Sequence, residues 1–126
     1  MTVPPTTRLL LVEDDDSVRA FTARALQIDG HTVDQADDGD IGLEKAAAKA
    51  GGYDLVLSDI RMPTMDGIEM AKELAKDFPD LKILLMTGYA EQRERARDLS
   101  AIIVDVVQKP FTLAEIRTAV AKALAA

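Results

Sequence analysis

Short apolar runs alternate with amphipathic segments along the whole chain. The runs lie at residues 8–12, 31–36, 54–58, 81–86 and 102–107. Runs of this length that are hydrophobic on both faces are typical of strands buried in a parallel sheet. The run at 31–36 is the weakest, which favours an edge position for that strand.

Between these runs, hydrophobic residues recur at helical spacing. They are Val18, Phe21, Ala25 and Ile28 after the first run, Ile68, Ala71, Leu74 and Phe78 after the third, and Leu113, Ile116, Val120 and Leu124 after the last. An alanine-rich segment from Asp38-Gly39 to Gly51-Gly52 predicts the second helix, and a highly charged segment at 90–99 predicts the fourth. Each apolar run is therefore followed by a predicted helix.

Polar residues predict where three of the helices begin. Asp15 or Asp16 is the expected N-cap of the first helix, because short polar side chains accept hydrogen bonds from the first turn. Asp66 and Thr112 are the expected caps of the third and last helices, each followed three residues later by a glutamate, as in a capping box.

Five strand–helix units in succession predict a parallel sheet with helices on both faces. Right-handed crossovers narrow this to a doubly wound, flavodoxin-like α/β fold with five parallel strands in the order 2-1-3-4-5. We expect a single domain over residues 8–126, preceded by a flexible tail at 1–7.

Composition removes several classes of function. The 126 residues include 15 basic and 22 acidic side chains, a net charge of −7, and no cysteine. An acidic protein is a poor candidate for broad electrostatic binding to nucleic acid or an anionic membrane. The missing cysteines exclude disulfides and thiolate chemistry. No apolar run approaches the ~20 residues of a membrane helix, and residues 1–7 do not form a signal peptide. We therefore expect a cytoplasmic protein.

Chemically distinctive residues follow the predicted strands. Glu13 and Asp14 end the first, Asp59 the third, Thr87 the fourth and Lys109 the fifth. Ligands of doubly wound sheets bind beyond the carboxyl ends of the strands, near the point where the strand order reverses. Three carboxylates, a hydroxyl and an ammonium group should therefore meet there.

Three clustered carboxylates need a proton or a cation. Two of them about 4 Å apart repel by roughly 4 kcal/mol at an effective dielectric of about 20. Oxygen ligands without histidine or cysteine favour Mg²⁺, with Mn²⁺ possible, over Zn²⁺. A carboxylate can also act as a nucleophile toward phosphorus and form an acyl phosphate.

Structural explanations exist for each residue taken singly. Thr87 alone would be a turn hydroxyl, and Lys109 before Pro110 a solvated loop lysine. Glu13 and Asp14 alone would be surface acids, but matching residues at several strand ends argue against that. Methionines 62, 65, 70 and 86 are expected to pack in the core, and His31 to lie exposed at a turn.

Four segments together resemble the receiver domain of two-component response regulators. They are LLLVEDD ending at Asp15, LVLSDIRMPTMDG around Asp59, LLMTGY around Thr87 and QKPF around Lys109. The resemblance covers about residues 8–125. The chain is also similar to stand-alone receivers of the CpdR type and to terminal receivers of hybrid kinases.

The resemblance implies a phosphorylation site at Asp59. Asp59 would accept a phosphoryl group from a histidine kinase or a histidine phosphotransfer protein. Asp14, Asp59 and the main-chain carbonyl of Arg61 would bind Mg²⁺ directly, and Glu13 mostly through a metal-bound water. Such a protein is not an enzyme in the usual sense, because it catalyses only its own phosphorylation and dephosphorylation.

The resemblance also implies a conformational switch. Thr87 and Lys109 would hold the phosphoryl oxygens and move inward on phosphorylation. The face formed by the fourth helix, fifth strand and fifth helix would then change shape for a downstream protein partner, without direct binding to nucleic acid. The Lys109-Pro110 peptide bond is a candidate for the cis form.

Two features depart from the receiver pattern, one at Val106 and one at residues 98–105. Val106 stands where receivers usually carry a switching tyrosine or phenylalanine. The sequence therefore does not show how the phosphorylation site is coupled to the partner-binding face. Arg61 and Tyr89 occupy positions that tune the dephosphorylation rate in receivers, with the direction open here. The segment DLSAIIVD at 98–105 lacks the usual Gly-Ala turn, so the fourth helix is expected to be short, shifted or mobile.

We expect a stand-alone response regulator, monomeric or weakly dimeric, since no output domain follows Ala126. The alternative is a receiver taken from a hybrid histidine kinase, or a phosphorelay intermediate. Three further classes compete. A phosphohydrolase would need a second aspartate where Arg61 stands, and a nucleotide or flavin binder would need a glycine-rich loop where the first acids stand. A degenerate receiver would only bind partners.

Overall fold

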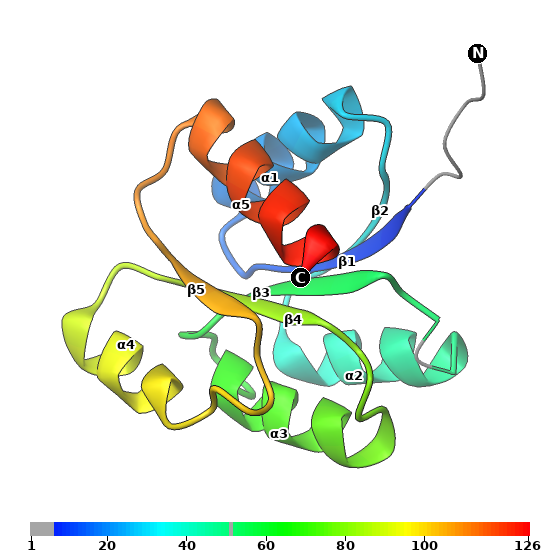
Figure 1. Cartoon of the computed structure of the whole chain (residues 1–126), viewed down its shortest axis with the longest axis vertical. Helices are drawn as coiled ribbons and strands as arrows, with labels where there is room; N and C mark the ends of the chain where they lie inside the picture. The colour runs from blue at the N-terminus through cyan, green and yellow to red at the C-terminus, as the bar shows by residue number, and fades with distance from the viewer. Residues whose placement is uncertain (1–6, 51) are drawn as a thin grey trace.

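The computed structural model describes residues 7–50 and 52–126, with the backbone alone at 90–92. Its centre is a parallel sheet of five strands in the order β2-β1-β3-β4-β5, as the sequence predicted (Figure 1). The strands are β1 (Arg8–Val12), β2 (Thr32–Ala36), β3 (Leu55–Asp59), β4 (Ile83–Thr87) and β5 (Asp105–Gln108). The reversal in strand order therefore falls between β1 and β3, where ligands bind in sheets of this kind.

Five helices cover the two faces of the sheet. They are α1 (Asp16–Ile28), α2 (Gly39–Ala48), α3 (Gly67–Asp77), α4 (Ala90–Arg97) and α5 (Leu113–Ala125). Helices α1 and α5 lie on one face, and α2, α3 and α4 lie on the other (Figure 1). No helix among the described residues is long and apolar enough to cross a membrane.

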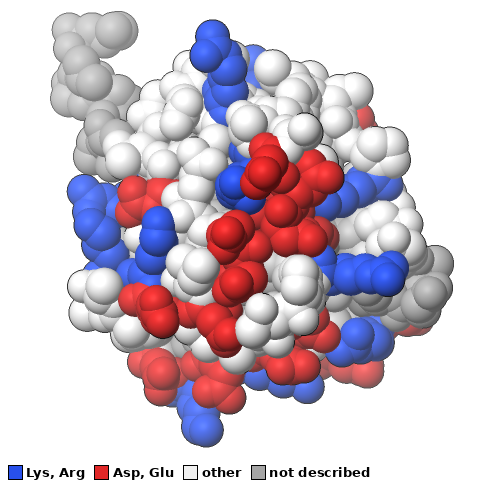
Figure 2. All heavy atoms as spheres, turned by 180° about the vertical axis from the view of Figure 1, so that it is seen from behind, with Lys and Arg blue, Asp and Glu red and all other residues white. Residues whose placement is uncertain are grey.

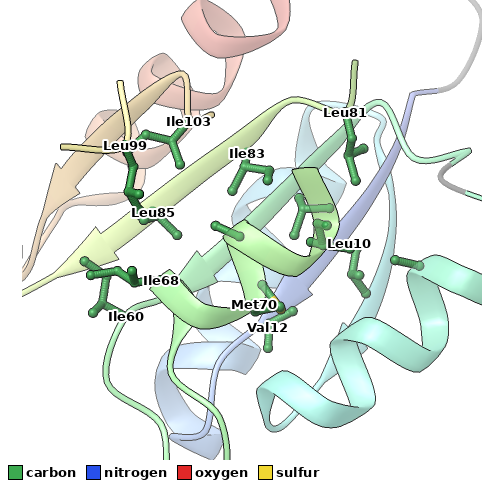
Figure 3. Packing of buried hydrophobic residues seen from close by; sticks show 14 of the residues in the cluster. Leu10, Val12, Ile60, Ile68, Met70, Leu81, Ile83, Leu85, Leu99 and Ile103 are labelled. Atoms are coloured by element: carbon green, nitrogen blue, oxygen red, sulfur yellow. The ribbon is translucent and has the colours of Figure 1, made fainter. Parts of the chain in front are cut away.

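Alternate residues of each central strand enter two separate hydrophobic cores. Leu9 and Leu11 of β1 pack with α1 and α5, whereas Leu10 and Val12 pack with α2, α3 and α4. Figure 3 shows the second core, in which Met70 of α3 faces the side chains of the sheet. This arrangement explains why the strand sequences lack an alternating polar pattern, since both faces of the sheet are buried.

The predicted helix starts are confirmed. The side chains of Asp15, Asp38 and Asp66 accept hydrogen bonds from the first turns of α1, α2 and α3. Thr112 and Glu115 form a full capping box at α5. Each such cap contributes about 1 kcal/mol to helix stability.

The predicted contact face of the first helix is partly wrong. Phe21 is 43% exposed and Ile28 is 59% exposed, although both share the helical spacing of the buried Ala25. The helix instead buries a neighbouring stripe that includes Ala23 and Leu26. Two adjacent stripes of this helix are apolar, and periodicity alone selected the one that partly faces solvent.

The predicted strand at 102–107 is also wrong at its start. β5 begins at Asp105, and the apolar residues Ile102 and Ile103 lie in the segment between α4 and β5. Ile103 is buried in the core shared by α3 and α4. Helix α4 has eight residues and ends at Arg97, before the predicted end at 99, so its expected shortness is confirmed.

Gly67 allows α3 to begin directly against the end of β3. A Cβ atom at this position would lie 2.2 Å from the carbonyl oxygen of Asp59, much too close for any side chain. The Gly67 N–H donates to the carbonyl of Ile60 at 2.7 Å, which fixes the loop that carries residues 60–66. The predicted tail falls mostly on residues 1–6, outside the described residues; the carbonyl of Thr7 accepts a hydrogen bond from Thr32.

Candidate functional site

Three carboxylates from two neighbouring strands meet at the carboxyl edge of the sheet. Glu13 and Asp14 follow β1 directly, and Asp59 is the last residue of β3. One carboxylate oxygen from each lies within 4.8 Å of the other two. The convergence predicted from the strand order is therefore found. At such distances each like-charged pair repels by about 3 kcal/mol or more at an effective dielectric of about 20.

Lys109 lies between two of these carboxylates. Its Nζ atom is 2.5 Å from Oε1 of Glu13 and 3.1 Å from Oδ2 of Asp59. Burial by itself would lower the pKa of Lys109, but the two carboxylates outweigh that effect and raise it. The side chain follows β5 and precedes a cis peptide bond to Pro110, as the resemblance suggested.

The three carboxylates differ in their access to water. Glu13 is fully buried, and Asp59 is buried at the base of the site. Asp14 is exposed, yet its pKa is raised by partial burial and by the hydrogen bond and negative charge of Glu13. Asp14 is therefore the carboxylate that solvent reaches most easily, and its surroundings disfavour its negative charge.

Thr87 ends β4 beside this group and is 1% exposed. Its hydroxyl accepts a hydrogen bond from the N–H of Tyr89 at 3.1 Å. The carbonyl of Thr87 accepts a hydrogen bond from the N–H of Lys109 at 2.8 Å. The backbone thus links the hydroxyl and the ammonium group of the site across β4 and β5.

Arg61 and Tyr89 face each other across the opening. The guanidinium carbon of Arg61 lies 5.1 Å from the centre of the Tyr89 ring, within cation–π distance. Both residues line a cleft of about 890 Å³ that also contains Asp14, Asp59 and Lys109. The two side chains predicted to tune access are therefore in contact at the mouth of the site.

Val106 is partly buried and packs against the core on the α3 and α4 side of the sheet. Helix α4 lies beside Val106, and two polar contacts connect this helix to other elements. Arg93 donates to the side chain of Gln108 at 3.1 Å, and Arg95 pairs with Asp66 at 3.3 Å. These exposed contacts join α4 to β5 and to the start of α3.

One contact beside the acidic residues was missed by reading the sequence. Arg19, in the first turns of α1, donates from Nη1 to the main-chain carbonyl of Glu13 at 2.9 Å. Nothing in the local pattern sets Arg19 apart from other helix-surface arginines. Its position relative to the loop becomes visible only when the strand and helix are placed together.

The donor set fits a hard divalent cation. Among the described residues, the clustered ligand atoms are all carboxylate oxygens, and the three carboxylates with the Lys109 ammonium carry two net negative charges. Figure 2 shows acidic side chains gathered in a band on one face of the molecule, which adds to the attraction for cations. One divalent cation would neutralise these two negative charges.

Comparison with known proteins identifies the fold and the family. The family model of the response regulator receiver domain matches residues 9–121. The chain belongs to the response regulator receiver family. Receiver domains are signalling switches controlled by phosphorylation, and as a member of this family the chain is such a switch.

Two receiver-containing relatives of Brucella abortus are similar over nearly the whole chain. The sensor kinase CckA is 43% identical over 92% of this chain, which spans 12% of that protein's length. The receiver protein CpdR is 36% identical over 94% of this chain and 98% of its own length. A solved receiver, TrrA of Thermotoga maritima in complex with Mg²⁺ and BeF, is 36% identical, with a TM-score of 0.83 and coverage of 94% and 99% of the two chains.

Proposed function

We propose that Asp59 is the phosphoacceptor of this receiver and takes its phosphoryl group from a phosphohistidine. The carrying observation is the convergence of Glu13, Asp14 and Asp59 with Lys109 at one sheet edge. The donor would be a histidine kinase or a histidine phosphotransfer protein. An oxygen of Asp59 attacks phosphorus, the P–N bond of the donor breaks, and its electron pair returns to the imidazole.

The metal of this site is proposed to be Mg²⁺. Asp14, Asp59 and the main-chain carbonyl of Arg61 would hold it directly, and Glu13 through water. When bound, the ion neutralises charge on the carboxylates and on the incoming phosphoryl oxygens. The Mg²⁺ and BeF in the TrrA structure support this assignment for a relative with 36% identity.

Thr87 and Lys109 are proposed to hold the phosphoryl group after transfer. Conversion of the Asp59 carboxylate to an acyl phosphate adds negative charge next to the Lys109 ammonium. Lys109 then has a stronger partner than its present contact with Asp59, and the Thr87 hydroxyl supplies a hydrogen bond. Both side chains are anchored on the strands next to α4, so their movement reaches that helix.

The downstream partner is proposed to bind the face of α4, β5 and α5. Because Val106 replaces the usual aromatic residue, we propose that the signal passes through the β4–α4 backbone. Tyr89 is hydrogen bonded to Thr87 and directly precedes α4, so an inward shift of Thr87 pulls on the first residue of the helix. Arg93, through Gln108, carries the displacement to β5.

Acetyl phosphate provides the direct test of the phosphoacceptor. Incubation with acetyl phosphate and Mg²⁺ should add about 80 Da to the intact protein. Asp59→Asn should abolish the addition, whereas Asp37→Asn, which changes an exposed acid elsewhere, should leave it intact. Addition of the same mass to the Asp59→Asn protein would refute the assignment.

A phosphorelay role is the second candidate, favoured by the 43% identity to the receiver-containing kinase CckA. In that role the acyl phosphate is passed on to a phosphotransfer protein. Phosphotransfer profiling against a panel of kinases and phosphotransfer proteins separates the two. Rapid loss of label from the protein to a histidine protein indicates a relay, and retention indicates a terminal switch.

A further inference from the structure

Arg19 holds the loop that carries the two acids of β1. Its guanidinium donates from Nη1 to the carbonyl of Glu13 at 2.9 Å and from Nη2 to Oδ1 of Asp16 at 2.6 Å. The side chain is only 20% exposed. One planar group therefore bonds the first residue of the loop, Glu13, and the first residue of α1, Asp16. This fork geometry is specific to arginine.

Further contacts of Glu13 and Asp15 also hold this loop. The N–H of Glu13 donates to the carbonyl of Ala36 in β2 at 3.0 Å. Asp15 caps α1 by accepting from Val18, and its own N–H donates to Oε2 of Glu13 at 3.3 Å. Asp14 is thus the single residue between a clamped Glu13 carbonyl and a helix cap.

We propose that Arg19 is a positioning residue for the metal site, acting through the Glu13 carbonyl to set where the Asp14 carboxylate lies. This inference rests on the proposed Mg²⁺ site and adds a residue that no motif assigns. Without Arg19, the carbonyl of Glu13 loses its partner and Asp16 is released. The short bridge that carries Asp14 then samples more conformations, and the metal must select among them.

The sign of the effect separates positioning from simple electrostatics. Arg19 is a cation close to a cation site, so removing its charge alone should strengthen Mg²⁺ binding. Removing a group that orients metal ligands typically weakens metal affinity by about 10-fold to 100-fold. The two explanations therefore predict changes of opposite direction for the same variant.

Calorimetric titration of the metal-free protein with MgCl₂ tests the proposal. We expect Arg19→Met to weaken Mg²⁺ affinity by about 10-fold or more. Arg19→Lys, which keeps the charge but not the fork, should also bind less tightly than the wild type. Arg24→Met removes the same charge from an exposed position of α1 and should change affinity less than twofold. Amide hydrogen exchange at Asp14 and Asp15 should be faster in both Arg19 variants before any metal is added.

The outcomes are distinguishable. If the wild type does not bind Mg²⁺, the proposed metal site itself fails. If the wild type binds and Arg19→Met binds equally or more tightly, with unchanged exchange at Asp14, the positioning role is refuted. If Arg19→Met does not fold, Arg19→Lys decides in the same way: unchanged affinity refutes the proposal, and weakened affinity with faster exchange supports it.

Discussion

Asp14→Asn should make the metal-free protein more stable while removing its response to Mg²⁺. The carboxylate of Asp14 lies within 4.8 Å of those of Glu13 and Asp59, and each pair repels by about 3 kcal/mol at an effective dielectric of about 20. Because Asp14 is exposed, water screens much of this repulsion. The attraction between Asp14 and Lys109 offsets a further part of it. We expect a net stabilisation of about 1–2 kcal/mol in the variant.

The raised pKa of Asp14 fixes the direction with pH. Because the folded protein holds this proton more tightly than the unfolded chain, ionisation of Asp14 costs stability. That cost is absent below the ordinary aspartate pKa of about 4 and grows as the pH rises through the raised folded value. The advantage of the variant should therefore be present at pH 7 and vanish toward pH 4.

Urea unfolding with EDTA or with MgCl₂ measures both effects. Mg²⁺ at ten times its dissociation constant should stabilise the wild type by about 1.4 kcal/mol and the variant much less. Asp37→Asn serves as a control, since it neutralises an exposed acid outside the site. A metal-free Asp14→Asn protein less stable than the wild type, or equal Mg²⁺ stabilisation of both proteins, would contradict the repulsion argument.

Three further changes follow from contacts described above. Gly67→Ala should lower the free energy of unfolding by about 2 kcal/mol, because the added Cβ would lie 2.2 Å from the carbonyl oxygen of Asp59. Gly88→Ala is the control, because its added Cβ would lie no closer than 3.7 Å to any atom beyond its chain neighbours, and it should change the free energy of unfolding little in the same urea assay. Tyr89→Ala should speed loss of the acyl phosphate several-fold by uncovering the site, whereas Tyr89→Phe keeps the ring that Arg61 contacts and should not; decay of the phosphorylated mass measures this. Thr112→Ala should lower thermal stability by about 1 kcal/mol through loss of its cap, measured by calorimetry.

The fold and the site were predictable for a common physical reason. Strands buried on both faces are continuously apolar, so the polar residues that follow them are easy to find in the sequence. Parallel strands bring all those ends to one edge, which placed Asp59 next to Glu13 without any structure. The chemical roles assigned to these residues stay predictions until the phosphate and metal experiments are done.

The parts that could not be predicted depend on packing rather than pattern. Phe21 is apolar and helix-spaced, yet it is 43% exposed because α1 buries the adjacent stripe instead. Ile103 looks like a strand residue because apolar turns and apolar strands have the same composition over a few residues. Arg19 acts through a main-chain carbonyl six positions earlier, a contact that exists only after β1 and α1 are folded together.

The edge formed by α4 and β5 is built with little burial. Among its described side chains, Ala96 alone is buried in α4, and the four-residue strand β5 pairs with β4 alone. Local opening costs least where few apolar groups leave the interior, so this margin should fray before the rest of the domain. The region that should open most easily therefore lies beside Lys109. A chemical change at that residue needs little free energy to alter the shape of the neighbouring surface.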